Sequence, residues 1–249
     1  MFYKITSNRN VGLEKVCVYN KGCNFKCLGC AYKTTAAEID QSAFDAPIET
    51  AKIKDALLAM NPKRVHFLGG EPTINSELGV VAEFAHEELG ATTEIGHSNG
   101  SGKIPSFIDE TSISIKAFDE NLHYQYTGVS NKKVLANFKD AYDRGITLRA
   151  STVLIPGMVT AEEVERIAHF VAEIDSNIPF HITAYIPVPG VSLRAPKINE
   201  IQEAVVASNK HLKHVSSTLL SATEFARFKK TNPLYISEQV ELKSLPASH

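Results

Sequence analysis

Three cysteines stand close together near the start of the chain, in the segment GCNFKCLGC at residues 22 to 30. Cys23, Cys27 and Cys30 form a CxxxCxxC triplet, and the fourth cysteine, Cys17, lies outside it. Four cysteines placed at random along a chain of this length would rarely give this spacing, so the triplet indicates a shared chemical role. In a reducing compartment such thiolates persist as metal ligands instead of pairing as disulfides. The triplet therefore predicts a metal centre.

The number of ligands narrows the kind of metal centre. Structural zinc takes four protein ligands, and no fourth Cys or His lies near the triplet. A four-iron cluster held by three cysteines leaves one iron free to bind a small molecule, which makes such a cluster catalytic. A cluster that only transfers electrons normally has four protein ligands. A non-catalytic zinc protein, in which a distant His completes the site, is the remaining alternative, and elemental analysis would distinguish it.

Cys17 lies within an expected strand, in contrast to the triplet. A small buried side chain is the commoner reason for a cysteine in such a place. We therefore do not count Cys17 as a fourth ligand.

The elements that must position the triplet follow a repeated pattern. Short β-branched runs alternate with amphipathic segments at intervals of about thirty residues, which is typical of βα units on a parallel sheet. This pattern predicts an α/β fold, a partial (β/α)6 barrel like an incomplete TIM barrel, with a mostly parallel sheet and outer helices. Six strands are expected, at Lys15 to Tyr19, Arg64 to Leu68, Thr92 to Gly96, Ser112 to Lys116, Thr147 to Ile155 and Phe180 to Ile186.

Three helices have clear apolar stripes. One is expected to end before Gly145, one to begin with a capping box formed by Thr160 and Glu163, and one to follow Pro196. The tail from Ser216 has weak periodicity, and we assign it no structure. The stripe of the first helix consists of Val134, Leu135, Phe138, Ala141 and Tyr142.

Length and composition limit the possible roles. The chain has 249 residues, is 43% hydrophobic and contains no long linker, so we expect a single domain over 1–249, with a core at about 12–215 and an extension at 216–249. The net charge is −2 with both signs interspersed, which argues against a nucleic-acid partner. No apolar run is long enough for a membrane span, and the start lacks a signal-peptide core. We expect a cytoplasmic protein without a membrane partner.

A second motif follows the triplet. The expected strand RVHFLGGEPT ends in Gly69, Gly70, Glu71 and Pro72. Glycines at the end of a strand let the backbone approach a ligand, and Glu71 offers an acceptor for an ammonium group. The two glycines are open to a simpler interpretation as a turn.

Together the two motifs resemble the radical S-adenosylmethionine (SAM) superfamily. In that family CxxxCxxC follows the first barrel strand, and GGEP binds the amino group of the methionine moiety of SAM. The resemblance implies that the three cysteines hold a [4Fe-4S] cluster and that Gly69, Gly70 and Glu71 bind S-adenosyl-L-methionine. The absence of a further cysteine group implies a single cluster.

Further segments resemble the branch of the family that includes the pyruvate formate-lyase activating enzyme. They are His97 to Gly100, the strand SISIK at 112–116, the Gly-Val-Ser before a helix within 123–145, and TVLIPGMV at 152–159. The resemblance covers roughly residues 15 to 215. It implies cofactor-binding roles for Ser98, Asn99, Ser114, Lys116, Arg149 and Ser151.

Some of these residues have structural alternatives. The segment from Ser98 to Gly100 is equally typical of a turn, and Lys116 could be a solvated strand tip. His66 and His181 lie in apolar strands, where a hydrogen-bonded histidine is commoner than a ligand. We leave both histidines out of the site.

The chain departs from the branch at three places. Ser114 stands where the branch often has Asp, which argues against a bound monovalent cation. Gly29 replaces an aromatic residue that neighbours the adenine in the family, so we expect unusual adenine contacts. Arg149 stands two residues before the usual arginine, with Ser151 in its place. Two residues on a strand share a face, so Arg149 is still expected to point inward.

The resemblance also implies a reaction. Reduction of the cluster, by a donor such as flavodoxin or ferredoxin, cleaves SAM and gives a 5′-deoxyadenosyl radical that abstracts a hydrogen atom. The leading hypothesis is an oxidoreductase-type activase that makes a glycyl radical in a partner enzyme. The alternative is radical modification of a small molecule or of another peptide on the same scaffold. The sequence leaves these two open.

Overall fold

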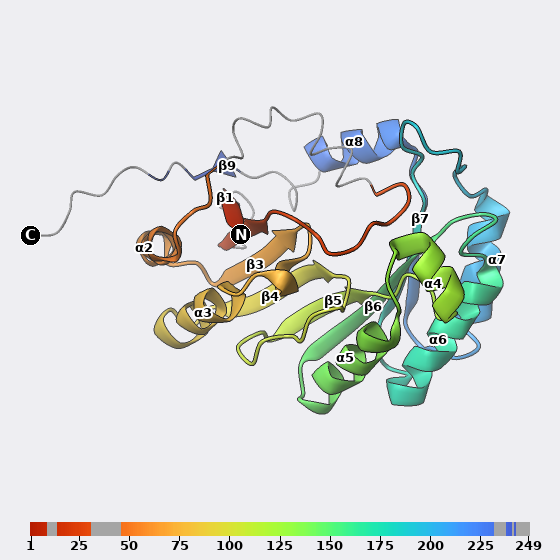
Figure 1. Ribbon diagram of the computed structural model, residues 1–249, viewed down its shortest axis with the longest axis horizontal. Coiled ribbons are helices and arrows are strands. Elements are labelled where there is room, and N and C mark those ends of the chain that lie inside the picture. The colour runs from red at the N-terminus through yellow and green to blue at the C-terminus, as the bar shows by residue number, and fades with distance from the viewer. Residues whose placement is uncertain (9–13, 31–45, 232–237, 241, 243–249) are drawn as a thin grey trace, which may run out of the picture.

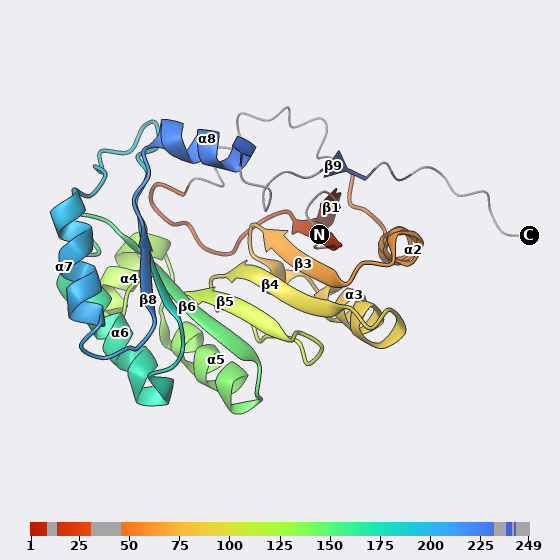
Figure 2. The same cartoon turned by 180° about the vertical axis from the view of Figure 1, so that it is seen from behind.

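The computed structural model describes residues 1–8, 14–30, 46–231, 238–240 and 242. The strands among them form one nine-stranded sheet in the order β8-β7-β6-β5-β4-β3-β2-β1-β9. Helices cover one face of this curved sheet (Figures 1 and 2). Within the described residues the edge strands β8 and β9 do not pair with each other, so the sheet does not close into a full barrel.

All six expected strands are present and lie next to one another in parallel. The prediction of a mostly parallel α/β sheet, a partial barrel, is therefore confirmed. The strands are β2 (Lys15–Asn20), β3 (Arg64–Gly69), β4 (Thr92–Ser98), β5 (Glu110–Ser114), β6 (Thr147–Leu154) and β7 (Phe180–Ala184).

Three further strands extend the sheet at its edges. β1 (Phe2–Asn8) lies antiparallel to β2, and the short β9 (Glu238–Gln239) lies antiparallel to β1. At the other edge β8 (Val215–Thr218) is parallel to β7, and α8 (Ala222–Thr231) follows it. The tail from Ser216, to which the sequence analysis assigned no structure, therefore contains part of a strand and a helix. The strand β8 lacks the apolar pattern that would reveal it in the sequence. Its residues Ser216 and Thr218 are polar and form hydrogen bonds with His181 on β7.

The three helices with apolar stripes are α5 (Lys132–Asp143), α6 (Ala161–Asp175) and α7 (Ile198–Ser208). Gly145 follows α5 with a φ of 80°, the conformation expected after a helix end. The other helical segments are α2 (Thr50–Met60), α3 (Leu78–Glu83) and α4 (Glu120–Thr127), with short turns at η2 (Pro72–Ile74) and η3 (Phe84–Glu88). None of the helices in the described ranges combines the length and apolar character that a membrane span needs.

The capping box expected at the start of α6 is absent. Thr160 is the residue before the helix, but its side chain makes no capping hydrogen bond. Glu163 accepts instead from the backbone N–H groups of Phe118, at 2.5 Å, and Asp119, at 2.8 Å. The carboxylate satisfies two partly buried donors just before α4, and it is therefore not available for its own helix.

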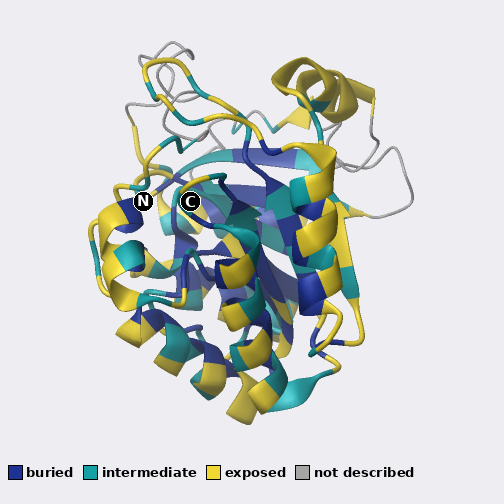
Figure 3. Cartoon of the chain, turned by 90° about the vertical axis from the view of Figure 1, so that its right-hand side faces the viewer, coloured by how far each residue is buried: buried dark blue, intermediate teal, exposed yellow. Residues whose placement is uncertain are grey.

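The helix-covered face of the sheet carries the hydrophobic core. Val65 and Phe67 of β3 are fully buried, whereas Arg64 and His66 at the alternate positions are only partly buried and face the other side. Figure 3 shows the sheet in dark blue beside helices whose outward surfaces are yellow. One continuous core runs from Phe2 to Leu212. The opposite face of the sheet is polar, and the candidate site lies at the carboxyl ends of its strands.

Candidate active site

The loop after β2 and the segment after β3 lie in direct backbone contact. The N–H of Gly70 donates to the carbonyl oxygen of Asn20 at 2.9 Å, and the N–H of Glu71 donates to that of Gly22, also at 2.9 Å. Gly69 has a φ of 114°, and a Cβ on Gly69 or Gly70 would collide with Asn20 or Gly22 respectively. Only glycine fits both places, because the backbones approach so closely. The two glycines thus join the cysteine loop to the GGEP segment.

The side chain of Asn20 stabilises this junction by hydrogen bonds. It is completely buried, and its side-chain amide donates to the carbonyl oxygen of Glu71 at 2.7 Å. Its side-chain oxygen accepts from Asn75 and from the N-terminal amino group of Met1, both at 3.1 Å. Asn20 was not among the expected site residues, although a polar residue at the end of a buried strand, just before the triplet, was an available signal.

The carboxylate of Glu71 organises the neighbouring turns. Only 1% of the residue is exposed, and its Oε1 accepts from the N–H and hydroxyl of Thr73, at 3.0 and 2.6 Å, and from the Ser98 hydroxyl at 2.9 Å. Its Oε2 accepts from the N–H of Asn99 at 2.5 Å. Protein donors thus fill much of the capacity of this carboxylate, which has about four acceptor positions. Its contact with an ammonium group stays a prediction, and its visible role is to orient residues 98–101.

The turn after β4 connects Glu71 to the cysteines. Asn99 donates from its side-chain amide to the sulfur of Cys23 at 3.7 Å and to Asn24 at 3.0 Å. Gly100 and Ser101 donate back to the side chains of Ser98 and Asn99, each at 2.9 Å. Residues 98–100 therefore form a turn that contacts the motif residues, and the binding of SAM by Ser98 and Asn99 stays a prediction.

The cysteine loop has a second anchor at the end of α4. The N–H groups of Lys26 and Leu28 donate to the carbonyl oxygens of Thr127, at 2.7 Å, and Tyr126, at 3.0 Å. In Figure 1 this orange-red segment leaves the sheet and runs toward α4. The loop is therefore held from two sides, and its backbone geometry does not depend on the thiols alone.

The three thiols of the loop are half-buried, and none of them forms a disulfide with another described cysteine. The Cys23 sulfur accepts from the N–H of Phe25 at 3.4 Å as well as from Asn99, which is an environment suited to a ligated thiolate. Burial raises the pKa of the unligated Cys23 thiol. No three His, Cys, Asp or Glu side chains in the described part of the chain are arranged to hold a single metal ion. Three thiols on one anchored loop supply the kind and number of donors that three irons of a four-iron cluster need.

Comparison with known proteins agrees with this arrangement. A model of the radical SAM superfamily matches residues 18–171, more than half of the 249 residues and inclusive of the triplet, the GGEP segment and the turn after β4. The chain belongs to the radical SAM superfamily. The cofactors of this radical SAM enzyme are accordingly a [4Fe-4S] cluster and S-adenosylmethionine.

One curated relative matches this radical SAM chain over most of its length. It is a protein of Methanocaldococcus jannaschii that is provisionally named a glycyl-radical enzyme activating enzyme. The identity is 28% over 238 residues, which cover 90% of this chain and 86% of the relative.

Two solved structures show the same fold as this chain. SuiB of Streptococcus suis has a TM-score of 0.59 and 17% identity, and the match covers 84% of this chain and 49% of SuiB, so this chain spans about half of SuiB. A domain of the pyruvate-formate lyase-activating enzyme from Bacteroides vulgatus has a TM-score of 0.51 and 18% identity, over 62% of this chain and 98% of that domain. At these identities the likeness is evidence for the fold alone.

Three further residues expected in the radical SAM site lie together, with Ser114 on β5, Ser151 on β6 and Lys116 just after β5. The ammonium group of Lys116 donates to the hydroxyl of Ser114 at 2.8 Å, and Ser114 is paired with Ser151 in the sheet register. Both serines are buried, and the N–H of Ile115 donates to the carbonyl oxygen of Ser151 at 2.9 Å. Lys116 therefore places a positive charge just beyond the carboxyl end of β5, and its contact with SAM stays a prediction.

Arg149 lies on the polar face as expected, but its partners are acidic side chains nearer the amino ends of the strands. It donates to Glu94 at 2.6 Å and lies 3.8 Å from Glu110. Arg64 contacts the same two carboxylates, each at 3.2 Å. The structure therefore does not bring Arg149 together with Glu71 or the cysteines, because its charge is already paired on β4 and β5. Its binding of SAM stays a prediction that this pairing does not favour.

The two histidines left out of the radical SAM site are hydrogen-bonded, as expected. His66 lies 3.1 Å from Glu94, and His181 contacts Ser216 at 2.8 Å and Thr218 at 3.0 Å. Burial lowers the pKa of both imidazoles, so both are neutral at pH 7. A neutral His66 donates its Nδ1–H to the Glu94 carboxylate.

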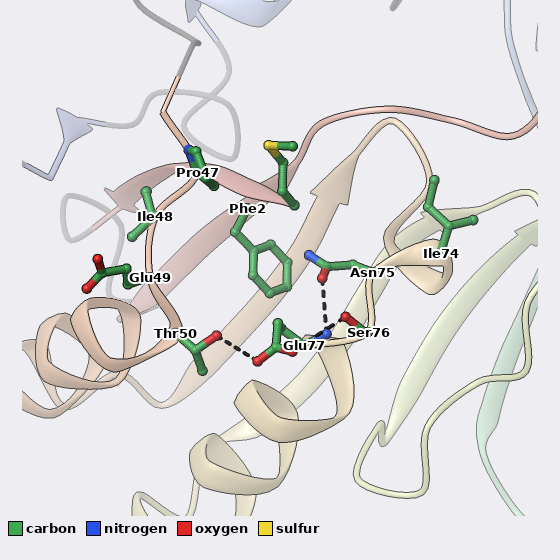
Figure 4. Close-up of a pocket in the computed structure, with 10 residues that line it drawn as sticks. Phe2, Pro47, Ile48, Glu49, Thr50, Ile74, Asn75, Ser76 and Glu77 are labelled. Carbon is green, nitrogen blue, oxygen red and sulfur yellow. Dashed lines mark hydrogen bonds between the residues drawn. The ribbon is translucent and has the colours of Figure 1, made fainter.

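A separate cavity of about 340 Å³ lies beside β1 and η2 (Figure 4). Phe2, Ile48 and Ile74 give it apolar walls, and Asn75 on its rim is the residue that donates to Asn20. None of the residues expected in the radical SAM site lines this cavity, so we do not assign the chemistry to it.

One aromatic residue of the radical SAM site could not be found from local sequence. Tyr185 follows β7, and a Cβ on Gly29 would collide with its hydroxyl and ring. The space that an aromatic residue at position 29 would need is thus occupied from the far end of the sheet. No signal near residue 185 indicates this, because the contact depends on the order of the strands.

Proposed function

We propose that this radical SAM enzyme abstracts a hydrogen atom from a glycine of a protein partner, as a glycyl-radical enzyme activase. The main support is the relative from Methanocaldococcus jannaschii, whose name carries this activity and whose match covers 90% of this chain. The unclosed sheet also supports a polypeptide substrate, since an open lateral edge suits a loop better than a small molecule. Modification of another peptide or of a small molecule is the alternative.

The residues of the chain would hold and orient the two cofactors. When bound, the cluster and SAM together supply the 5′-deoxyadenosyl radical that abstracts hydrogen. Cys23, Cys27 and Cys30 would be the cluster ligands. The Gly69 to Glu71 segment would bind the methionine moiety, and the Glu71 carboxylate holds the turn at 98–101 against it.

Further polar side chains would stabilise the bound cluster and SAM. Asn99 would keep its amide hydrogen bond to the Cys23 sulfur, which neutralises part of the charge on a ligated thiolate. We further propose that Ser114, Ser151 and Lys116 contact the cofactor at the ends of β5 and β6.

The setting of the reaction is part of the proposal. An electron donor such as flavodoxin or ferredoxin would reduce the cluster. The reducing cytoplasm would keep the cysteines from forming disulfides, so that they can bind the cluster. We propose that the 249 residues act as one domain, a view supported by the continuous core of the described residues.

The first test is anaerobic reconstitution with iron and sulfide. We expect charge-transfer absorbance of a cluster and reductant-dependent release of 5′-deoxyadenosine from SAM. Variants Cys23→Ala, Cys27→Ala and Cys30→Ala should each lose both signals. A reconstituted protein that forms no cluster, or that never cleaves SAM, would contradict the cofactor roles given to these residues.

The second test concerns the substrate. The reduced enzyme is mixed with a glycyl-radical enzyme encoded beside it, and electron paramagnetic resonance is recorded. A glycyl radical that requires SAM supports the activase. Deuterium transfer from a labelled small molecule or from another peptide into 5′-deoxyadenosine, without a glycyl radical, would favour the alternative.

A further inference from the structure

Tyr185 carries an unexplained polar group beside the cysteine loop. The residue is 3% exposed, and its hydroxyl is buried without a hydrogen-bond partner among the described residues. Its backbone is held at the carboxyl end of β7, where its N–H donates to the carbonyl oxygen of Leu154 at 3.1 Å. A buried hydroxyl without a partner destabilises the folded state, so its presence at this position calls for a reason.

The hydroxyl is directed at the loop that carries the cluster ligands. Gly29 precedes Cys30 in the chain and has a φ of 68°, and a Cβ there would collide first with the Tyr185 hydroxyl. Glycine therefore meets two needs at this position, a left-handed backbone and room for the phenol. The fit joins residues 29 and 185 and positions the hydroxyl against the residue that directly precedes the third cysteine of the triplet.

A second buried tyrosine, Tyr126, also lies near the cysteine loop. It is 5% exposed and its carbonyl oxygen anchors Leu28 of the loop. Its pKa is raised, chiefly by burial, with further contributions from Cys27, Cys30 and Tyr185. Cys27, Cys30 and Tyr185 therefore all lie within electrostatic range of Tyr126.

We propose that the Tyr185 hydroxyl donates a hydrogen bond to a sulfur atom of the [4Fe-4S] cluster, at the Cys30 side, and raises the reduction potential of that cluster. A donor aimed at a cluster sulfur stabilises the reduced state, in which the sulfurs carry more negative charge. The otherwise unpaired hydroxyl then gains its partner when the cluster is present. The proposal concerns the cofactor and does not depend on which substrate the radical attacks.

The test compares Tyr185→Phe with the wild-type chain after reconstitution. Only the hydroxyl is removed, so we expect an unchanged iron content and a cluster midpoint potential shifted to a more negative value in an EPR-monitored redox titration without substrate. Tyr124→Phe is the matched control, because Tyr124 is 62% exposed on α4 and its variant should show no shift.

Binding of SAM provides a second readout. We expect the dissociation constant for SAM, measured by calorimetry, to stay within twofold of wild type in Tyr185→Phe. An unchanged potential with weaker SAM binding would overturn the proposal and assign the hydroxyl to the adenine. An unchanged potential with unchanged SAM binding would overturn it as well.

A second variant covers the case in which Tyr185→Phe does not retain the cluster. Site-specific 3-fluorotyrosine at position 185 keeps the hydroxyl and makes it a stronger donor. We expect the midpoint potential to shift to a more positive value. No shift, or a shift to a more negative value, would overturn the proposal.

Discussion

A Cβ atom on Gly70 would collide with the carbonyl oxygen of Gly22, because the segment after β3 lies directly against the cysteine loop. The same contact is reinforced from the neighbouring residue, since the N–H of Glu71 donates to that oxygen at 2.9 Å. The loop that carries the triplet and the GGEP segment are thus positioned by each other.

The variant Gly70→Ala should therefore displace the cysteine loop. We expect a strong loss of iron content after reconstitution, because two backbones would have to separate to admit one methyl group. The control is Gly79→Ala in α3, where the new Cβ would meet only Pro105 at 3.8 Å. This control should retain its iron. Its free energy of unfolding should equal that of the wild type or exceed it by up to about 1 kcal/mol. Full iron retention in Gly70→Ala would show that the contact is not required.

The variant Glu71→Gln tests the carboxylate that joins the two turns. All four groups that contact it are donors, so an amide NH₂ would place donor against donor. We expect a loss of about 1–3 kcal/mol in the free energy of unfolding, measured by urea titration, and weaker SAM binding by calorimetry. Glu88→Gln, at an exposed position, is the control. Equal stability of the two variants would contradict this role.

The four cysteines should divide into three ligands and one packing residue. Cys17 lies on β2 in register with His66 and is 9% exposed, and burial raises the pKa of its thiol. We expect Cys17→Ala to bind as much iron as wild type, since Cys17 lies away from the loop. Cys30→Ala should bind far less. The iron-to-protein ratio measures both, and a joint loss would mean that Cys17 is a ligand after all.

The charged cluster on the polar face should make stability depend on pH. Burial by itself would raise the pKa of Glu94, but its hydrogen bond to His66 and the charges of Lys15 and Arg149 outweigh burial and lower it to about 2. The folded chain therefore binds this proton more weakly than the unfolded chain does. The stabilisation is present above pH 4.5 and is lost between about pH 4.5 and 2, by roughly 2–3 kcal/mol.

Protonation of His66 should also lower the stability of the folded chain as the pH falls, at a higher pH than protonation of Glu94 does. The pKa of His66 is lowered by burial, so protonation of this imidazole favours the unfolded state. Stability should begin to fall as pH drops below about 6.5. Urea unfolding of the cluster-free chain at several pH values measures both steps. In Glu94→Gln the step between pH 4.5 and 2 should shrink, and an unchanged step would contradict the assignment to Glu94.

Much of the fold could be predicted because its signals are local. The strands from Lys15 to Phe180 are short β-branched runs whose period of two is visible in the chain, and α5 and α6 have apolar stripes. The edge strand β8 could not be predicted in this way. Its polar residues Ser216 and Thr218 suit a partner, His181, that only the folded sheet provides.

The sequence by itself determined the chemistry, because the three expected cluster ligands of this chain lie within one short loop, so that their spacing is visible as CxxxCxxC. The tertiary structure decided which other groups reach that loop. It drew Arg149 to Glu94, turned the Glu71 carboxylate toward Thr73, Ser98 and Asn99, and placed Tyr185 over Gly29. These contacts depend on strand order and on the pairing of buried polar groups. Hydrogen bonds, ion pairs and packing contacts act over a few ångströms in space, whatever the separation of the residues along the chain.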